Sequence, residues 1–160
     1  MDLITHLPAS PETGNDSVVV FVDRLSKMTH FVPTHHTVDA PGLAELYIQH
    51  VFRLHGVSRR VVSDRHSKFT SDFWRHVFKR LGTDMHMSSG YHPQTDGQTE
   101  RMNRTLEEML RAFCGAEGMQ DRWEHYLPIA EFQYNNGTQA STGYTPFFLN
   151  KGSILTLLPV

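Results

Sequence analysis

Three carboxylates stand at positions where a fold could bring them together. Asp2 lies in the first apolar segment, Asp64 ends the segment "VSRRVVSD", and Glu100 begins a helical segment after the polar loop "YHPQTDGQT". Clustered carboxylates repel each other, so such a group implies a hard cation with oxygen ligands. Two Mg²⁺ or Mn²⁺ ions at such a site can activate an attacking oxygen and stabilise a leaving oxygen at phosphorus. The sequence therefore predicts a catalytic metal site at Asp2, Asp64 and Glu100.

The elements that must position these carboxylates begin with three strands. Two apolar runs, Val18–Val22 and Met28–Val32, flank the polar turn "DRLS" and indicate an antiparallel hairpin. The upstream segment "MDLITHL" predicts a third strand, separated from the hairpin by a loop that contains Pro and Gly. If this strand neighbours the one that ends at Asp64, Asp2 and Asp64 are adjacent at a crevice.

Helices and strands then alternate. Helical spacing of apolar residues runs from Pro41 to Leu54, and Gly56 stands at the stop position. The segments "VSRRVVSD" and "TDMHMS" predict strands on either side of the helix "SDFWRHVFKRLG", an order that makes these later strands parallel. Further helices are expected from about Gln98 to Cys114, over "DRWEHYLPIAEFQYNN" and over "TPFFLNKG". We therefore expect an α/β fold with a mixed five-stranded sheet and helices on both faces.

The helix from Gln98 to Cys114 has an apolar stripe and an opposite polar face. Asn103, Arg104 and Arg111 fall on the same face as Glu100 and could contact a phosphate-bearing ligand beside the metal site. The alternative is a solvated face on which Glu107 pairs with Arg111. With Lys68 and the loop before the helix, the candidate contacts to such a ligand are Lys68, His92, Gln94, Thr95, Gln98, Asn103, Arg104 and Arg111.

Composition and charge exclude only a few classes of protein. A chain of 160 residues, 39% hydrophobic, is long enough for one domain with its own core. The formal net charge of -2 does not indicate a nucleic-acid partner, so DNA binding would depend on a local arrangement of basic residues. The single Cys114 excludes an internal disulfide, and the eleven histidines lack zinc-finger spacing. With neither a signal peptide nor an apolar span, we expect a soluble, intracellular protein.

Several segments together resemble a known family. The motifs "VVSDR", "KFTSDFW", "YHPQTDGQTERMNRTLEEMLR" and "GYTPFFLNKG" are similar, in order, to the integrase catalytic core of gypsy-type LTR retrotransposons, which are relatives of retroviral integrases. Thirty-five residues separate Asp64 from Glu100, which is the family's spacing between its second and third acidic ligands. Asp2 in "MDLI" matches the first ligand. One departure is His66, because an acidic residue commonly follows "SDR" in the family.

This resemblance implies a ribonuclease-H-like fold and a polynucleotidyl transferase that uses two Mg²⁺ or Mn²⁺ ions. The implied reactions are 3′-end processing of element cDNA by water and transfer of the 3′ ends to target DNA. The implied partners are DNA and other copies of the chain, in the nucleus or in a cytoplasmic particle, without a membrane. We expect residues 1–160 to be a catalytic core with a truncated N-terminal edge and neither a zinc-binding nor a C-terminal DNA-binding domain, as in a polyprotein fragment or a degenerate copy.

Other interpretations stay open at this point. Glu100 could merely complement the helix N-terminus, which is worth roughly 0.5 kcal/mol. Asp64 could be a turn residue after a strand, and Asp2 an unpaired terminal residue. The domain could also be a catalytically silent, domesticated DNA-binding or assembly module, or a ribonuclease H that cuts RNA in hybrids.

Overall fold

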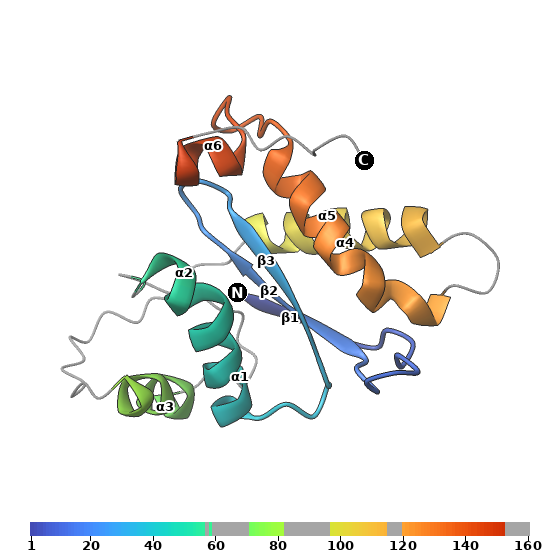
Figure 1. Cartoon of the computed structure of the whole chain (residues 1–160), viewed down its shortest axis with the longest axis vertical. Coiled ribbons are helices and arrows are strands. Elements are labelled where there is room, and N and C mark those ends of the chain that lie inside the picture. The colour runs from blue at the N-terminus through green and yellow to red at the C-terminus, as the bar shows by residue number, and fades with distance from the viewer. Residues whose placement is uncertain (57, 59–70, 82–96, 115–119, 153–160) are drawn as a thin grey trace.

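An antiparallel sheet carries the first predicted site residue. The computed structural model describes residues 1–56, 58, 71–81, 97–114 and 120–152. Its strands β1 (Asp2–Ile4), β2 (Ser17–Val22) and β3 (Thr29–Thr34) pair in the order β1-β2-β3 (Figure 1). The predicted hairpin and its third strand are thereby confirmed. Of the two later strands predicted, only Ser58 is described, so the five-stranded mixed sheet remains a prediction.

β1 is shorter than the seven-residue segment predicted for it. The strand ends at Ile4, and His6 has a φ of 66°. A positive φ is uncommon for a residue with a side chain and turns the backbone out of the extended conformation. Beyond this turn, Leu7 packs against the second core, and its backbone N–H donates to the Asp16 carbonyl at 3.0 Å.

The first helical segment runs where the sequence predicts it. α1 (Ala40–Tyr47) is capped by the Asp39 side chain, which accepts the Gly42 N–H at 2.8 Å. A π-helical turn, η1 (Ile48–Phe52), joins it to α2 (Arg53–His55), and Gly56, at a φ of 78°, ends the helix. The remaining helical elements are α3 (Ser71–Arg80), α4 (Gly97–Cys114), the 3₁₀ turn η2 (Gln120–Arg122), α5 (Trp123–Asn136), which continues past Pro128, and α6 (Pro146–Lys151).

Alternation along the strands sends side chains to two separate cores, one on each face of the sheet. Figure 1 shows α1 and α3 on one side of the strands and α4 and α5 on the other. The first core contains Leu3, Val19, Phe21, Val32, Leu43, Tyr47, Phe73 and Val77. The second contains Ile4, Val18, Val20, Phe31, Leu106, Leu110, Trp123, Leu127 and Ala130. The prediction of helices on both faces is confirmed for the described residues.

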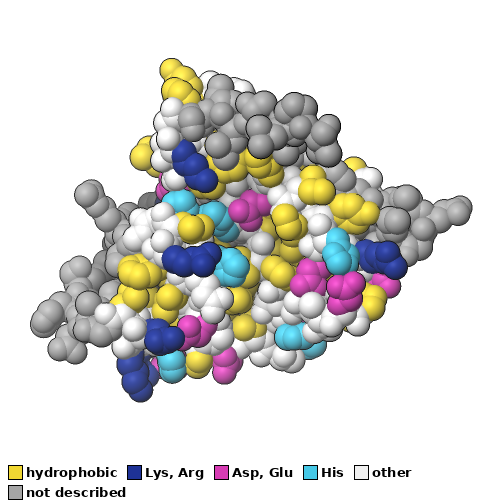
Figure 2. All heavy atoms as spheres, viewed as in Figure 1, with side chains coloured by type: hydrophobic (Ala, Val, Ile, Leu, Met, Phe, Trp, Pro, Cys, Tyr) yellow, Lys and Arg dark blue, Asp and Glu magenta, His cyan; other side chains and the backbone are white. Residues whose placement is uncertain are grey.

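The surface viewed in Figure 2 has basic, acidic and histidine side chains interspersed rather than gathered by sign. This agrees with the small formal net charge of -2. Within the described part of the chain, none of the helices is both long and apolar enough to cross a membrane.

Two side chains of α5 bond the backbone of β3. The buried Asn135 accepts the Thr29 N–H at 2.9 Å and donates to the Thr29 carbonyl at 2.8 Å. Glu131 accepts the Phe31 N–H at 2.8 Å. These contacts hold α5 along the outer side of β3.

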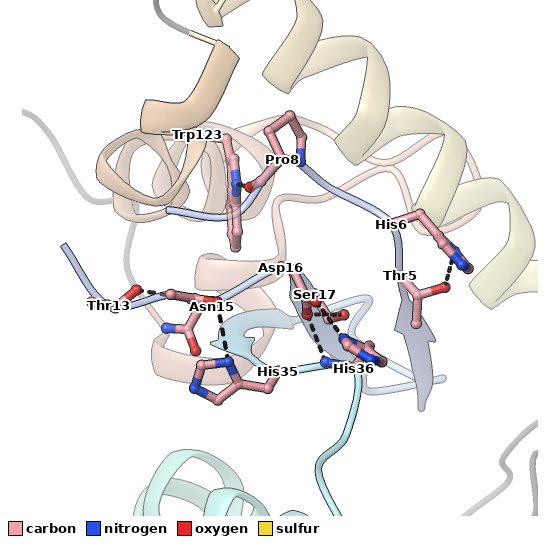
Figure 3. A network of polar contacts seen from close by, with 11 residues as sticks. Thr5, His6, Pro8, Thr13, Asn15, Asp16, Ser17, His35, His36 and Trp123 are labelled. Atoms are coloured by element: carbon pink, nitrogen blue, oxygen red, sulfur yellow. Dashed lines mark hydrogen bonds and ion pairs between the residues drawn. The ribbon is translucent and has the colours of Figure 1, made fainter. Parts of the chain in front are cut away.

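The connection between β1 and β2 is fastened to the start of α5. The Trp123 indole donates to the Pro8 carbonyl at 2.7 Å (Figure 3). Glu124, the next residue, accepts hydrogen bonds from the Thr13 hydroxyl at 2.6 Å and the Asn15 amide at 3.0 Å. The conformation of the loop between β1 and β2 is thus fixed by contacts with α5, which lies more than a hundred residues later in the sequence.

The start of β2 is bonded to the segment that follows β3. Asp16 accepts the backbone N–H of His36 at 2.6 Å, bonds its imidazole and accepts the Ser17 hydroxyl at 3.0 Å (Figure 3). Desolvation acts to raise the pKa of Asp16, but these hydrogen bonds lower it from 3.8 to about 2. The ionised carboxylate is therefore the form that the fold favours.

We expect this carboxylate to contribute to acid sensitivity. Because its pKa is lower in the folded state, its contribution to stability is present above pH 3.8 and is lost as the pH falls towards about 2. Asp16→Asn should therefore flatten the pH dependence of the unfolding free energy over that window, as measured by urea denaturation. The control, Gln133→Ala, at an exposed position without an ionisable group, should keep the wild-type dependence. An unchanged slope in Asp16→Asn would contradict the prediction.

Candidate active site

Asp2 is held between its own strand and α4. It lies in β1, opposite Val20 of β2, and is partly buried. Its Oδ1 accepts the Leu3 N–H at 2.8 Å, and its Oδ2 accepts a hydrogen bond from the side-chain amide of Asn103. Both carboxylate oxygens therefore have a protein donor, which fixes the orientation of the group.

Packing of α4 against the sheet explains why Asn103 reaches Asp2. Leu106 and Leu110 are buried in the core formed with Val18 and Val20. Asn103 precedes Leu106 by three residues, so the two are neighbours on the helix surface. The apolar stripe predicted from the sequence thus positions one polar residue of α4 over β1.

One atom of this pair has no hydrogen-bonding partner among the described residues. Oδ1 of Asn103 is buried, and the described residues provide no donor to it. An amide oxygen beside a carboxylate is a hard oxygen set, and Mg²⁺ and Mn²⁺ prefer such ligands. The chemistry of these two side chains therefore fits a divalent cation. Among the described residues, no group of three His, Cys, Asp or Glu side chains could hold a metal ion.

The other predicted metal ligands are described less completely. Glu100 belongs to α4, three residues before Asn103, but its side chain falls outside the described part, as does that of Gln98. Asp64 also lies outside the described residues. The same holds for the candidate DNA contacts Lys68, His92, Gln94 and Thr95, and for His66.

Two predicted DNA-binding arginines are exposed on α4. The Arg111 guanidinium lies 3.2 Å from the Glu107 carboxylate, one helical turn earlier, and its side chain is 76% exposed. This is the pairing expected of a solvated face, and at such exposure it adds little stability. Arg104 is exposed as well. Both side chains are accessible to a large ligand.

Two acidic residues outside the predicted metal site have structural roles. Asp23 lies in the hairpin turn, where it accepts the Ser26 N–H at 2.9 Å and the Ser26 hydroxyl at 2.6 Å. Desolvation acts to raise the pKa of Asp23, but these hydrogen bonds and that from Leu25 lower it. Asp72 lies in the first turn of α3 and pairs with Arg75 at 2.6 Å.

The contact of Asn103 with Asp2 was missed by sequence reasoning. The sequence assigns Asn103 to DNA contact, whereas its amide bonds a predicted metal ligand 101 residues earlier in the chain. The available signal was the spacing of three residues between Glu100 and Asn103, which makes them neighbours on a helix.

Known proteins resemble this chain in sequence. No family model matches the chain. It is 36% identical over 147 residues, 92% of its length, to the Transposon Tf2-3 polyprotein of Schizosaccharomyces pombe, and equally to the Tf2-4 polyprotein. The chain spans only 11% of the length of these relatives.

Solved structures share the fold. In a simian T-cell lymphotropic virus intasome in complex with PP2A regulatory subunit B56 gamma, one chain matches with a TM-score of 0.66 and 16% identity, over 98% of this chain and 59% of that one. The magnesium-bound HTLV-2 integrase catalytic core domain, in its trimeric form, matches with a TM-score of 0.61 and 14% identity, over 91% and 99%. By sequence the chain is therefore a relative of one segment of retrotransposon polyproteins, and by structure it has the fold of retroviral integrase catalytic cores.

Proposed function

We propose that this chain is the catalytic core of a metal-dependent polynucleotidyl transferase that integrates retrotransposon cDNA. The proposed reactions are removal of terminal nucleotides by water and attack of the recessed 3′-hydroxyl on target DNA. Both are displacements at phosphorus, so one metal site can serve both. Residues 1–160 would act as part of a larger polyprotein, given that the chain spans 11% of its relatives.

The contact between Asp2 and Asn103 is the observation that carries this proposal. It brings the first predicted ligand next to α4, the helix that contains Glu100. Positions three apart on a helix are neighbours, so Glu100 is expected on the side of α4 that faces Asp2. Asp64 would complete the set from the segment that follows α2.

Each residue then has a distinct part in the proposed chemistry. Asp2, Asp64 and Glu100 would hold two Mg²⁺ or Mn²⁺ ions, which supply Lewis acidity to the attacking and leaving oxygens. Asn103 would act as a positioning residue, because its amide fixes the Asp2 carboxylate. DNA would be bound by Lys68, His92, Gln94, Thr95, Gln98, Arg104 and Arg111.

The comparisons support the proposed cofactor and partners. The HTLV-2 core was solved in complex with magnesium and in a trimeric form, and the simian virus protein in an intasome. We extend to this chain the use of a divalent cation and assembly with further copies, and we propose that its nucleic-acid partners are cDNA ends and target DNA. Such a protein would act in the nucleus, after passage in a cytoplasmic particle.

Activity on defined nucleic acids tests the proposal. The purified chain should nick or rejoin a branched DNA substrate in the presence of Mn²⁺. Activity on an RNA/DNA hybrid but not on DNA ends would instead identify a ribonuclease H, and no turnover would support a silent module. In a crystal soaked with Mn²⁺, the ion should occupy a position shared by Asp64 and Glu100.

Asn103→Ala should lower DNA strand transfer by about 10- to 100-fold, the usual effect of losing a residue that orients a metal ligand. The variant should also need a higher Mn²⁺ concentration for half-maximal rate, because Asp2 loses the donor to Oδ2. That shift distinguishes a positioning role from a structural one. Glu108→Ala, at an exposed position of the same helix, is the matched control. A rate loss with no change in Mn²⁺ dependence would refute the positioning role.

A further inference from the structure

Away from the proposed active site, a buried histidine links a carboxylate to a second histidine. Nδ1 of His30, in β3, lies 2.9 Å from Oε1 of Glu131, in α5. Its Nε2 lies 2.8 Å from Nε2 of His55, in α2. His30 is 8% exposed, whereas His55 is open to solvent. Figure 2 shows histidine side chains gathered beside an acidic one between α2 and α5.

The hydrogen bonds of Glu131 determine which ring nitrogen of His30 carries a proton. Its Oε2 accepts the Phe31 N–H at 2.8 Å, and a carboxylate offers only acceptors. Nδ1 of His30 must therefore carry the proton that it shares with Oε1. When His30 is neutral, its Nε2 is consequently an acceptor, and Nε2 of His55 donates to it.

Proton counting then limits the charge that the pair can hold. One added proton leaves the contact intact, because a cationic imidazole donates through Nε2 and the neutral one accepts. A second added proton places N–H groups on both Nε2 atoms, which are 2.8 Å apart. Two donors, each on a cation, repel each other at that distance, so the doubly protonated pair cannot keep this geometry.

The charged groups around the pair act on the same equilibrium. Partial desolvation of the otherwise exposed His55 ring lowers its pKa, the charge of His30 lowers it further, Asp23 opposes this effect and Lys151 of α6 adds to it. Burial also lowers the pKa of the neighbouring His50, in η1, with a further lowering from His30, an opposing effect of Glu131 and a lowering from Arg53. The surroundings thus favour a low positive charge on the cluster.

We propose that His30 and His55 form a proton-operated clasp, which holds α2 against β3 and α5 until both imidazoles are protonated. The clasp is closed with no added proton or one, and it opens when the second binds. Opening would release α2, whose last residue, His55, precedes Asp64 by nine positions in the chain. The contacts that form the clasp are distinct from the contact between Asp2 and Asn103, so the proposal of the clasp does not depend on the proposed enzymatic function.

NMR titration of the whole chain from pH 8 to pH 5 tests the clasp. The ring signals of His30 and His55 should titrate in two steps separated by about one pK unit or more, as expected of coupled sites. Hydrogen exchange followed in parallel should show the protection of the α2 amides falling about tenfold across the second step, since one pK unit corresponds to a factor of ten. Protection in β2 should persist.

Two variants isolate the second proton. His55→Gln keeps a hydrogen-bonding side chain but cannot be protonated, so the loss of α2 protection should disappear. His125→Gln removes a different exposed histidine, one that faces Glu12 at 3.2 Å rather than another imidazole, and it should keep the wild-type behaviour. The clasp is refuted if both imidazoles titrate at one midpoint with constant protection, if the step survives in His55→Gln, or if β2 loses protection together with α2.

Discussion

Glu100→Gln should abolish DNA strand transfer while leaving the melting temperature nearly unchanged. The neutral amide keeps the size of the side chain but lacks the charge that would hold a divalent cation. A catalytic metal ion is worth several kcal/mol of transition-state stabilisation, so the rate should fall by about a thousandfold or more. The effect on the helix should be small, because a charge near an exposed helix N-terminus is worth roughly 0.5 kcal/mol.

Transfer of a labelled oligonucleotide in Mn²⁺ and thermal unfolding by circular dichroism measure these two quantities. Glu108→Gln, an exposed glutamate of the same helix, provides the control and should behave as the wild type in both. A large loss of stability in Glu100→Gln would show that Glu100 is structural. Undiminished strand transfer would remove it from the metal site.

Trp123→Ala should destabilise the fold by about 3–5 kcal/mol, the range for truncating a large buried aromatic side chain. Trp123 is 2% exposed and packs in the core shared by α4, α5 and the sheet. Its indole also donates to the Pro8 carbonyl at 2.7 Å, so truncation leaves that carbonyl without its bond. Because a single domain is stable by about 5–15 kcal/mol, the variant should unfold at much lower urea concentration.

Urea denaturation at neutral pH checks this prediction. Trp123→Phe should lose less stability than Trp123→Ala, because it keeps most of the apolar volume and loses the donor. Ile129→Ala, on the same helix at 55% exposure, should stay within about 0.5 kcal/mol of the wild type, as surface substitutions usually do. Equal losses for the alanine variants at 123 and 129 would show that Trp123 is not part of the core.

Local chemistry made much of the fold predictable. β-Branched residues of Val18–Val22 form a strand, Asp23 closes the hairpin turn that follows, and Gly56 ends the first helical segment where no side chain opposes a positive φ. The apolar spacing of α4 also located Leu106 and Leu110 in the core. These features depend on residues within a few positions of each other, so each can be predicted from one short segment of the sequence.

The features that were not predicted depend on partners distant in the sequence. The spacing from Pro41 to Leu54 gave a helix but no sign of the π-helical turn within it. The bond between Asn103 and Asp2 joins residues 101 positions apart. A polar side chain has no periodic pattern that identifies its partner, so such pairs emerge only from the packing of whole elements.

The bonds from α5 to β3 decide how copies of this protein can associate. Along Thr29–Thr34, all of which is described, the N–H groups that point away from β2 belong to alternate residues, 29, 31 and 33. Asn135 accepts the first and Glu131 the second, while Pro33 has none. A strand from another molecule would therefore find no donor along this edge, so the sheet cannot be extended between molecules through β3. The proposed assembly with further copies would therefore use other surfaces.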